Sequence, residues 1–548
     1  MRYDTGRTFI RPSVVFVSPA EHRKVVFASS LGTVFEWYDF YLYATLAPFF
    51  AVLFFPPGND TAALLSAFAT YAAGFLIRPV GAIVFGHIGD RMGRKYAFLI
   101  TIVLMGTSTF AVGLLPTYAH IGWLAPLMLV VLRLAQGFAL GGEYGGAATY
   151  VAEHTPARQR GLATGWIQTT ATVGFLLSLA IIVVCRSSIP AQQFAEWGWR
   201  IPFLLSIILL MISAYIRLSL NESPLFEHMR ATGKLSKTPV AESFLRTPNS
   251  RYVLLALLGA TAGQGVVWYA GQFYVLFYMQ ITLKVDCDIA YHLMMIALLL
   301  SAPFFVFAGW LSDKIGRKPI ILTGCLLAAM TYFPIFSALT RAVNPDLAAF
   351  QRTTAITLAA DTDACRFHVF VGPWTEFSDC DRAKDYLTKL GLSFRTVHRP
   401  GQPGGIIIGD NPEQPIAGWA SSRAAANVLL ALKVNGYPEK ANPAKMNLPL
   451  IIFLLTTMMI YVCMVYGPMA AFLVELFPTR IRYTSMSLPY HIGNGWFGGM
   501  LPLVATAMVA ASGNIYYGLW YPVCVAAMTF IVGLLFLRDR RVQDSPRA

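Results

Sequence analysis

The stretch GHIGDRMGRK, residues 86–95, is a short charged turn between two long apolar segments. A second copy, GWLSDKIGRK, occupies residues 309–318, and both copies follow the pattern Gly-x-x-x-Asp-(Arg/Lys)-x-Gly-Arg-Lys. A charged turn of this kind is typical of a loop that joins two membrane-spanning helices. Its repetition indicates a membrane protein built from two related halves.

A second motif is repeated in the same order along the chain. EHTPARQR at 153–160 and ELFPTRIR at 475–482 share the pattern Glu-x-x-Pro-x-Arg-x-Arg. The charged turns start 223 residues apart and the second motifs start 322 residues apart, so the separations differ by 99 residues. Two homologous halves, with roughly a hundred extra residues inserted between 318 and 475, explain both separations.

The composition is that of a membrane protein. The chain has 548 residues, of which 56% are hydrophobic and 13% charged, with a mean hydropathy of +0.55. Soluble domains carry about 25% charged residues. The net charge of +14 comes from basic residues at the ends of apolar segments, which fits a bilayer-embedded protein and argues against nucleic-acid binding.

Apolar runs of about twenty residues recur along the chain, and each is long enough to cross a bilayer core of about 30 Å as a helix. We therefore expect an all-α membrane protein with twelve transmembrane helices in two six-helix halves. The expected helices are 26–55, 62–89, 96–115, 122–151, 161–185, 200–220, 252–280, 289–311, 319–340, 448–475, 484–511 and 516–537.

Basic residues concentrate on one side of this arrangement, which places both termini in the cytoplasm by the positive-inside rule. The first residues lack the long apolar core and cleavage site of a signal peptide, so we expect the first helix to be retained. The expected location is a bacterial inner membrane. The expected organisation is a tail (1–25), a six-helix half (26–220), a central cytoplasmic loop (221–251), helices seven to nine (252–341), an insertion (342–447), helices ten to twelve (448–537) and a tail (538–548).

The insertion is polar and carries mixed charges, which predicts a small solvated α/β domain on the periplasmic side. The expected strands are 367–372, 392–397 and 405–409, and the expected helices are about 379–390 and 421–434. In an oxidising periplasm Cys365 and Cys380 can form a disulfide, and the alternative is two free thiols. The domain could bind a periplasmic partner, cover the outer entrance, or be a passive insertion.

The charged turns resemble the signature loops of the major facilitator superfamily, which join helices two and three and helices eight and nine. Further motifs resemble one branch, the metabolite:proton symporters for proline and betaine, 2-oxoglutarate, citrate and shikimate. These motifs are FEWYDF (35–40), RPVG (78–81), RLAQG (133–137), GGE (141–143) and WGWRIPF (197–203). The resemblance implies a twelve-helix transporter. It does not extend to the insertion, which has no counterpart in the usual architecture of the family, or to the sequence GQGVVWYAGQFY at 263–274.

Ionisable residues inside the apolar segments are functional candidates, because a charge there costs a few kcal/mol or more without a partner or a wet cavity. Asp39 and Arg133 both fall near the bilayer midplane, at a rise of about 1.5 Å per residue. We hypothesise that Asp39 carries a proton and that Arg133 is its switchable partner. The alternative is a permanent structural ion pair. Glu36, which shares a helix face with Asp39 and Tyr43, and His491 are further proton-carrying candidates.

Arg78 and Arg133 together could make a positively charged binding region. Such a region favours a small organic acid or zwitterion as the substrate, because guanidinium groups bind carboxylates in a bidentate manner. For Arg78, the alternative is a side chain that extends to the inner surface. For the other polar residues, the alternative is interhelical hydrogen bonding and packing. The substrate-binding candidates are Arg78, Arg133, Tyr43, Gln264, Trp268, Gln272, Tyr490 and Asn494.

The repeated charged motifs are assigned to conformational gating, because carboxylates, guanidiniums and helix dipoles can hold neighbouring helices in one state and release them in another. The gating candidates are Asp90, Arg91, Arg94, Glu153, Asp313, Arg317 and Glu475.

No enzymatic, metal or cofactor site is expected. GNGWFG at 493–498 matches Gly-x-Gly-x-x-Gly, but it lies in a membrane helix with no preceding strand, and no ATP-binding Gly-x-x-x-x-Gly-Lys-Ser/Thr loop occurs. The sequence therefore predicts a secondary transporter that takes up a metabolite with protons by alternating access. The alternatives are a proton-independent facilitator or exporter, or a nutrient sensor on a transporter scaffold.

Overall fold

The computed structural model describes residues 19–56, 60–153, 155–218, 222, 224–233, 235–366, 376–402, 404–409, 416–417, 419 and 422–537. Twelve helical spans in this part of the chain are long and apolar enough to cross a membrane. This confirms the expected all-α architecture with a small inserted sheet.

The N-terminal half contains spans one to six, and several helices continue past the bilayer length. Its elements are α1 (Pro19–Phe54), α2 (Asp60–Leu76) with α3 (Arg78–Arg91), α4 (Arg94–Leu114), α6 (Leu124–Glu153), α7 (Arg160–Ser188) and α9 (Arg200–Leu218). The short helices α5 (Tyr118–Ile121) and α8 (Ala191–Gln193) lie in its connections, and α10 (Pro224–Ala231) and α11 (Pro239–Phe244) lie in the central loop.

The C-terminal half contains spans seven to twelve. Its elements are α12 (Asn249–Ala256), α13 (Ala262–Tyr269) and α14 (Val275–Phe277) in span seven, α15 (Cys287–Ile315), α16 (Arg317–Val343), α20 (Leu448–Tyr466) with α21 (Met469–Leu476), α22 (Arg482–His491) with α23 (Leu501–Ser512), and α24 (Trp520–Phe536). Spans seven and eleven contain π-helical turns at Leu257–Thr261, Ala270–Tyr274, Tyr278–Thr282 and Ile492–Gly499. Such turns occur frequently at functional sites.

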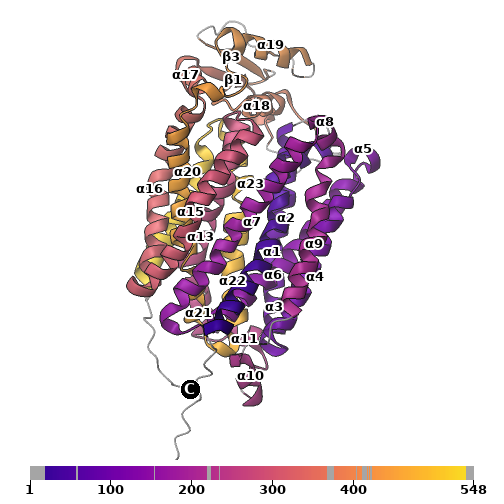
Figure 1. Cartoon of the computed structure of the whole chain (residues 1–548). Helices are drawn as coiled ribbons and strands as arrows, with labels where there is room; N and C mark the ends of the chain where they lie inside the picture. Colours follow the sequence, from indigo (N-terminus) through magenta and orange to yellow (C-terminus); the bar gives the residue numbers. More distant parts are fainter. Residues whose placement is uncertain are drawn as a thin grey trace, which may run out of the picture.

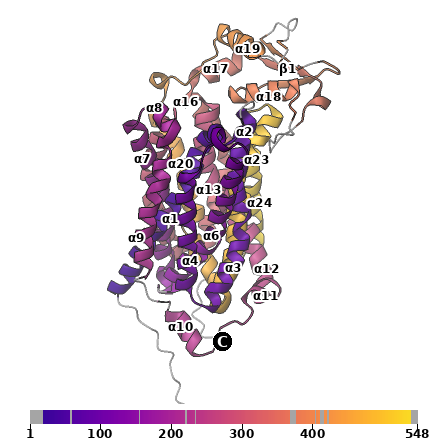
Figure 2. The same cartoon turned by 90° about the vertical axis from the view of Figure 1, so that its right-hand side faces the viewer.

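The two halves lie side by side and meet along α7 with α15 and along α3 with α22. Figure 1 shows the two halves beside each other, and Figures 1 and 2 both show the inserted domain at one end. The charged turns lie at the opposite end, which we call the turn end. The glycine before the Arg-Lys pair of each turn motif, Gly93 or Gly316, has a φ of 126° or 104° and directly precedes α4 or α16. Only glycine adopts such a backbone conformation readily, which explains its place in both copies.

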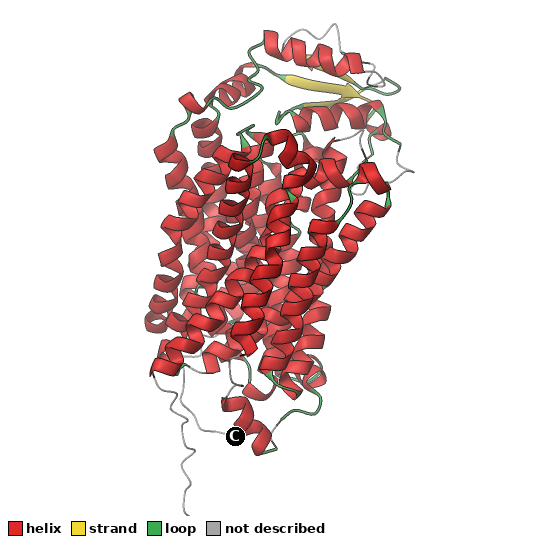
Figure 3. Cartoon of the chain, turned by 45° about the vertical axis from the view of Figure 1, so that its right-hand side comes forward, coloured by secondary structure: helices red, strands yellow, loops and turns green. Residues whose placement is uncertain are grey.

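The insertion lies between α16 and α20 and folds into a three-stranded sheet with helices (Figure 3). Its elements are α17 (Pro345–Thr353), β1 (Ile356–Ala360), α18 (Asp379–Lys389), β2 (Arg395–His398), β3 (Gly405–Ile408) and α19 (Ser422–Val434). The strand order is β2-β1-β3, with β2 parallel and β3 antiparallel to β1. Strand β1 was not predicted, and the predicted strand at 367–372 lies outside the described residues.

Hydrogen bonds attach the insertion to the C-terminal half. The Phe394 N–H donates to Gly513 O at 2.7 Å, and the Ala441 N–H donates to Lys284 O at 3.1 Å. The Lys284 ammonium donates to the carbonyl of Lys389 at the end of α18. Helix α18 also packs against α2 of the N-terminal half and α23 of the C-terminal half. The insertion therefore lies over the junction of the two halves.

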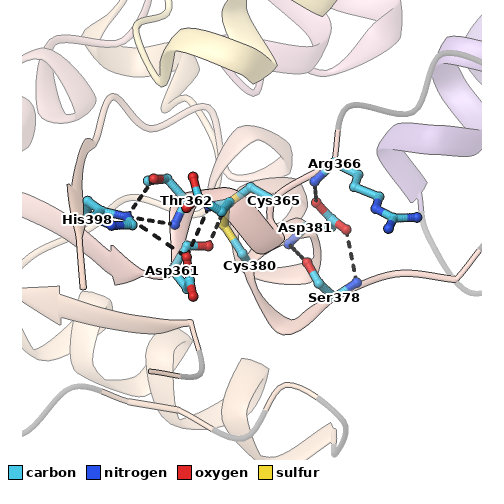
Figure 4. Close-up of a disulfide and its surroundings, with 9 residues drawn as sticks. Asp361, Thr362, Cys365, Arg366, Ser378, Cys380, Asp381 and His398 are labelled. Atoms are coloured by element: carbon cyan, nitrogen blue, oxygen red, sulfur yellow. Dashed lines mark hydrogen bonds and ion pairs between the residues drawn. A yellow bond between two sulfur atoms is a disulfide. The ribbon is translucent and has the colours of Figure 1, made fainter. Parts of the chain in front are cut away.

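A disulfide joins Cys365 to Cys380 across the start of α18 (Figure 4). Ser378 caps this helix in a capping box with Asp381, whose carboxylate also accepts a hydrogen bond from the Arg366 N–H at 2.7 Å. Capping of this kind fixes where a helix begins. The bridge and the cap together hold the segment after β1 against α18.

Asp361 and His398 lie beside the disulfide (Figure 4), and the potential ligand atoms of Asp361, Asp363 and His398 lie within 4.8 Å of one another. The Asp361 carboxylate accepts hydrogen bonds from the N–H groups of Gly401 and Asp363, which lower the pKa of Asp361. Local turn hydrogen bonds therefore account for this cluster.

Candidate functional site

The first charged turn joins the two halves through Asp90, near the end of α3. Its Oδ2 accepts hydrogen bonds from the Thr484 N–H at 3.0 Å and from the Thr484 hydroxyl at 2.7 Å. Thr484 lies in the first turn of α22, where N–H groups have no partner within the helix. A carboxylate at this position is also favoured by the helix dipole. The contact therefore holds the halves together at the turn end.

The second charged turn makes the matching contact in the opposite direction. Asp313, near the end of α15, accepts hydrogen bonds from the N–H groups of Gly161 at 2.9 Å and Leu162 at 2.8 Å, in the first turn of α7. Arg317 forms ion pairs with Asp313 at 2.6 Å and Glu475 at 3.1 Å. Each turn thus caps a helix that follows the Glu-x-x-Pro-x-Arg-x-Arg motif of the other half.

A third contact between the halves is the ion pair of Glu153 with Arg482 at 3.3 Å. Of the predicted gating residues, Asp90, Glu153, Asp313, Arg317 and Glu475 lie in these contacts. Arg91 is exposed, and the side chain of Arg94 lies outside the described part. The turn end is therefore closed in this conformation.

Arg78 is the first residue of α3, directly after the break at Ile77 between α2 and α3. Pro79 has no N–H and therefore suits the first turn of this helix, where the N–H groups of Val80 and Gly81 donate to Ile77 O. Arg78 is 1% exposed, and its guanidinium carbon lies 4.1 Å from the ring centre of Phe75 and 4.4 Å from that of Phe40. Its Nε and Nη2 have no hydrogen-bond partner in the protein. Arg78 thus lies in the interior rather than at the inner surface.

Arg133 lies on α6 against aromatic rings of α1 and α2. Its Nη1 donates to Gln136 Oε1 at 2.6 Å, whereas Nε and Nη2 have no partner in the protein. The guanidinium carbon lies 4.3 Å from the ring centre of Tyr43 and 5.2 Å from that of Tyr71, within the range of cation–π attraction. The Tyr43 hydroxyl donates to the carbonyl of Ala67, so Tyr43 offers its ring rather than its hydroxyl.

The structure does not pair Asp39 with Arg133. Both residues lie in the described part of the chain, where no ion pair joins them, and Asp39 Oδ1 has no partner. Glu36 instead pairs with Arg217 on α9 at 2.5 Å, and Glu143 on α6 lies within hydrogen-bonding distance of Glu36. Sequence reasoning assigned no role to Arg217 or Glu143. Their signal was the same as that of Asp39, an ionisable group in an apolar helix.

In the C-terminal half, Gln264 and Asn494 bind each other. Gln264 Nε2 donates to Asn494 Oδ1 at 3.1 Å, and Asn494 Nδ2 donates to Gln264 Oε1 at 2.5 Å. Gln264 and Asn494 therefore form an interhelical hydrogen bond, the alternative to substrate binding, and this bond joins span seven to span eleven. The Tyr490 hydroxyl bonds with that of Tyr466 at 3.1 Å, and the Tyr490 ring stacks on Tyr144 of the other half with a centroid distance of 3.4 Å.

Other predicted residues of this half present polar atoms without a protein partner. Gln272 is fully buried with both amide atoms unpaired, and the Trp268 indole N–H and both ring nitrogens of His491 are also unpaired. The Trp268 ring lies 5.7 Å from that of Tyr41 on α1, so it contributes to the junction of the halves.

Both halves line a small central cavity of about 10 Å³, which has room for little more than one water molecule. Arg78 and Glu143 contribute from the N-terminal half, and His491 and Tyr490 from the C-terminal half. Buried polar groups are nearly always hydrogen-bonded, so the unpaired atoms of the lining residues Arg78 and His491 indicate a site for polar ligands or water. Arg133 also has unpaired atoms, but it is not one of the residues that line this cavity. The pathway is closed around this site in the present conformation.

Comparison with known protein families identifies the class of protein. The model of the Major Facilitator Superfamily matches residues 29–350, more than half of the chain. The chain therefore belongs to the major facilitator superfamily, and it is a multi-pass membrane transporter rather than an enzyme.

Characterised relatives transport metabolites. The shikimate transporter of Escherichia coli (strain K12) is 36% identical over 333 residues, which cover 60% of this chain and 75% of that protein. The alpha-ketoglutarate permease of the same strain is 35% identical, over 58% of this chain and 72% of that protein. The glycine betaine/proline/ectoine/pipecolic acid transporter OusA of Dickeya dadantii is 28% identical over 533 residues, 96% of this chain and 85% of that protein.

Solved structures show the same fold. The xylose transporter XylE from E. coli, in a partially occluded inward open conformation, has a TM-score of 0.61 at 16% identity and covers 96% of this chain and 99% of that chain. The likeness extends over both halves, so the two halves are arranged as in other proteins of this fold.

Proposed function

We propose that the chain takes up a small carboxylate-bearing or zwitterionic metabolite together with protons by alternating access. The observation that carries this proposal is the pair of buried arginines, Arg78 and Arg133, each of which has its Nε and Nη2 without a partner in the protein. Aromatic rings surround both groups. A carboxylate would satisfy these N–H groups with bidentate, charge-assisted hydrogen bonds.

The charges of the N-terminal half support coupling to a proton. The helices of this half bury three arginines, Arg78, Arg133 and Arg217, and three acids, Glu36, Asp39 and Glu143, so these six charges balance when all are ionised. Protonation of one carboxylate leaves one positive charge in excess, which a substrate carboxylate would neutralise. Substrate and proton would then bind more strongly together than either does alone, which is the requirement for symport.

Two sites are candidates for the proton. Asp39 is buried with an unpaired oxygen, which a protonated acid tolerates better than a carboxylate does. Glu36 and Glu143 lie in contact, and two adjacent carboxyl groups are stable when they share a proton. The substrate class is supported by the relatives, because shikimate, alpha-ketoglutarate, proline and glycine betaine all carry a carboxylate.

The proposed setting is a bacterial inner membrane, with the turn end and both termini in the cytoplasm and the insertion in the periplasm. The positive-inside distribution supports this orientation. The closed turn end would then be the inner gate, held by Asp90 and Asp313. Opening it would require these carboxylates to leave the first turns of α22 and α7.

Uptake into proteoliposomes tests the proposal. Labelled shikimate, 2-oxoglutarate and glycine betaine would be offered with and without an inward proton gradient, with a protonophore as the control. We expect the gradient to drive accumulation of at least one compound and the protonophore to abolish it. Equilibration that ignores the gradient would contradict coupling and favour a facilitator, and binding without flux would favour a sensor.

A further inference from the structure

A second, larger cavity lies beneath the insertion, at the end of the molecule opposite the charged turns. Its volume is about 310 Å³, and three parts of the chain line it. Val52 and Leu64 contribute from α1 and α2, Lys284 and Thr506 from the C-terminal half, and Thr388 and Lys389 from α18 of the insertion. The walls are mostly apolar, and the two lysines lie where α18 ends. The insertion therefore forms the roof of a space between the two halves.

Lys284 brings a positive charge to this cavity when its ammonium group is protonated. It follows span seven with a φ of 59°, and its ammonium donates to the carbonyl of Lys389, which leaves further N–H bonds available. Burial and the neighbouring Lys389 lower the pKa of Lys284 to about 8. The neighbouring charge that acts on Lys284 is therefore a second positive charge. An anion in the cavity would relieve both the burial and the repulsion.

Thr388 adds a hydrogen-bonding group on the same side. Its hydroxyl is buried and has no partner in the protein, although the residue lines the cavity. Buried hydroxyl groups are nearly always satisfied. An ammonium group and a free hydroxyl beside apolar walls match a ligand with one anionic end and an apolar body.

We propose that this cavity is a capture site for small organic carboxylates on their way to the central site. Lys284, Lys389 and Thr388 would hold the carboxylate, and Val52 and Leu64 would contact the body of the ligand. The inference rests on the proposed function for the ligand class and for the central site as the ligand's destination. It assigns the insertion a direct part in binding, as the roof of the site.

A cysteine introduced at Val52 would report the charge of the cavity, because its rate of modification by a charged reagent depends on that charge. The measurement does not require transport. Val52 lines the cavity and is 83% exposed, so Val52→Cys should react readily. The background would carry Cys287→Ser and Cys524→Ser, because these free cysteines are not buried. The rates of cysteine modification would be measured in nanodiscs at low salt with two reagents. The anionic reagent is sulfonatoethyl methanethiosulfonate, and the cationic reagent is trimethylammonioethyl methanethiosulfonate.

We expect the anionic reagent to be favoured, and we expect Lys389→Gln and Lys284→Gln each to lower the anionic-to-cationic rate ratio by roughly threefold. Lys389→Gln keeps the backbone carbonyl that Lys284 binds, so it tests charge without removing that attachment. Lys284→Arg should leave the ratio unchanged. Lys440→Gln, at an exposed position of the insertion outside the cavity lining, is the matched control for net charge.

Protection identifies the ligand. Sodium 2-oxoglutarate should slow modification of Val52→Cys, glycerol should not, and Thr388→Val should weaken the protection without altering the rate ratio. Equal ratios in the lysine variants, or ratios that change without protection by a carboxylate, would overturn the proposal. Either result leaves the proteoliposome assay of the proposed function unaffected, so the two failures can be told apart.

Discussion

Asp90 and Thr484 are 394 residues apart in the chain, yet the Asp90 carboxylate accepts both the backbone N–H and the hydroxyl hydrogen bond of Thr484. The contact crosses from the N-terminal to the C-terminal half. Its counterpart crosses back, from Asp313 to Gly161 and Leu162. Because each carboxylate caps the first turn of a helix in the other half, separation of the halves at this end breaks two helix caps at once.

Removal of either cap charge should favour opening of the turn end. Asp313→Asn and Asp90→Asn keep the side-chain size but lose the charge–dipole attraction, which is worth about 1 kcal/mol and corresponds to roughly a fivefold shift in population. Spin labels at the exposed positions Arg158 and Lys314 would show a larger fraction of long distances by pulsed electron resonance. Asp346→Asn, which affects an exposed pair with Lys445 in the insertion, should leave the distances unchanged.

The buried arginines should be sensitive even to conservative replacement. Arg133→Lys and Arg78→Lys keep the charge but lose the planar fork of donors, so affinity for a carboxylate substrate should fall about tenfold or more. Equilibrium binding of a labelled substrate measures the loss. Arg200→Lys is the control, because Arg200 binds the carbonyls of Gly113 and Leu115 away from the central site. Unchanged binding in the first two variants would remove these arginines from the substrate site.

Asp39→Asn should separate transport from its driving force. A side chain that cannot release a proton should abolish gradient-driven accumulation, while exchange of labelled for unlabelled substrate continues. Counterflow and gradient-driven uptake, measured side by side, make the distinction. If Asp39→Asn still accumulates substrate in a proton-dependent way, the proton site moves to Glu36 and Glu143, and Glu143→Gln becomes the decisive variant. Glu196→Gln, at an exposed site, is the control.

Lys284 should titrate near neutrality. With its pKa lowered from 10.5 to about 8, the folded protein binds fewer protons than an unfolded chain between these values, so folding stability should rise with pH across that interval. Reductive ¹³C-methylation and NMR would show one lysine signal that titrates near 8, assigned by its absence in Lys284→Arg. Addition of 2-oxoglutarate should move that titration upward, and a titration at the ordinary lysine value would contradict the lowered pKa.

The disulfide should stabilise the insertion without being needed for transport. It closes a loop with a sequence separation of 15, for which the expected contribution is about 3 kcal/mol. Pulse proteolysis of the full-length protein should show earlier cleavage of the insertion in the double variant Cys365→Ser, Cys380→Ser. The twelve-helix part should resist protease as before, because both replaced cysteines lie in the insertion.

Hydropathy and motif repetition predicted the twelve helices and the place of the insertion, because bilayer thickness imposes a minimum apolar length on every span. Strand β1 was missed because ITLAA is a short apolar run next to a helix, where periodicity gives little guidance. The sheet order could not be predicted from the sequence pattern, since strand pairing depends on the whole domain.

The sequence predicted which residue types lie in the candidate site better than it predicted which residues contact one another. Depth in the bilayer placed Asp39 and Arg133 at the same level, but depth says nothing about the direction in which a helix face points. Arg133 faces Tyr43 and Gln136 instead. The pairing of Glu36 with Arg217 depends on how α1 and α9 pack, and no local pattern records that packing.

The chain leaves and rejoins the membrane body at adjacent points, since the Asn447 N–H donates to Ala342 O at 2.9 Å, just before α20 begins and just before α16 ends. Roughly a hundred residues are therefore accommodated without parting the ninth and tenth spans. Such a junction makes the domain an exchangeable accessory. Related transporters could acquire, lose or replace it in evolution while the translocation machinery stays intact.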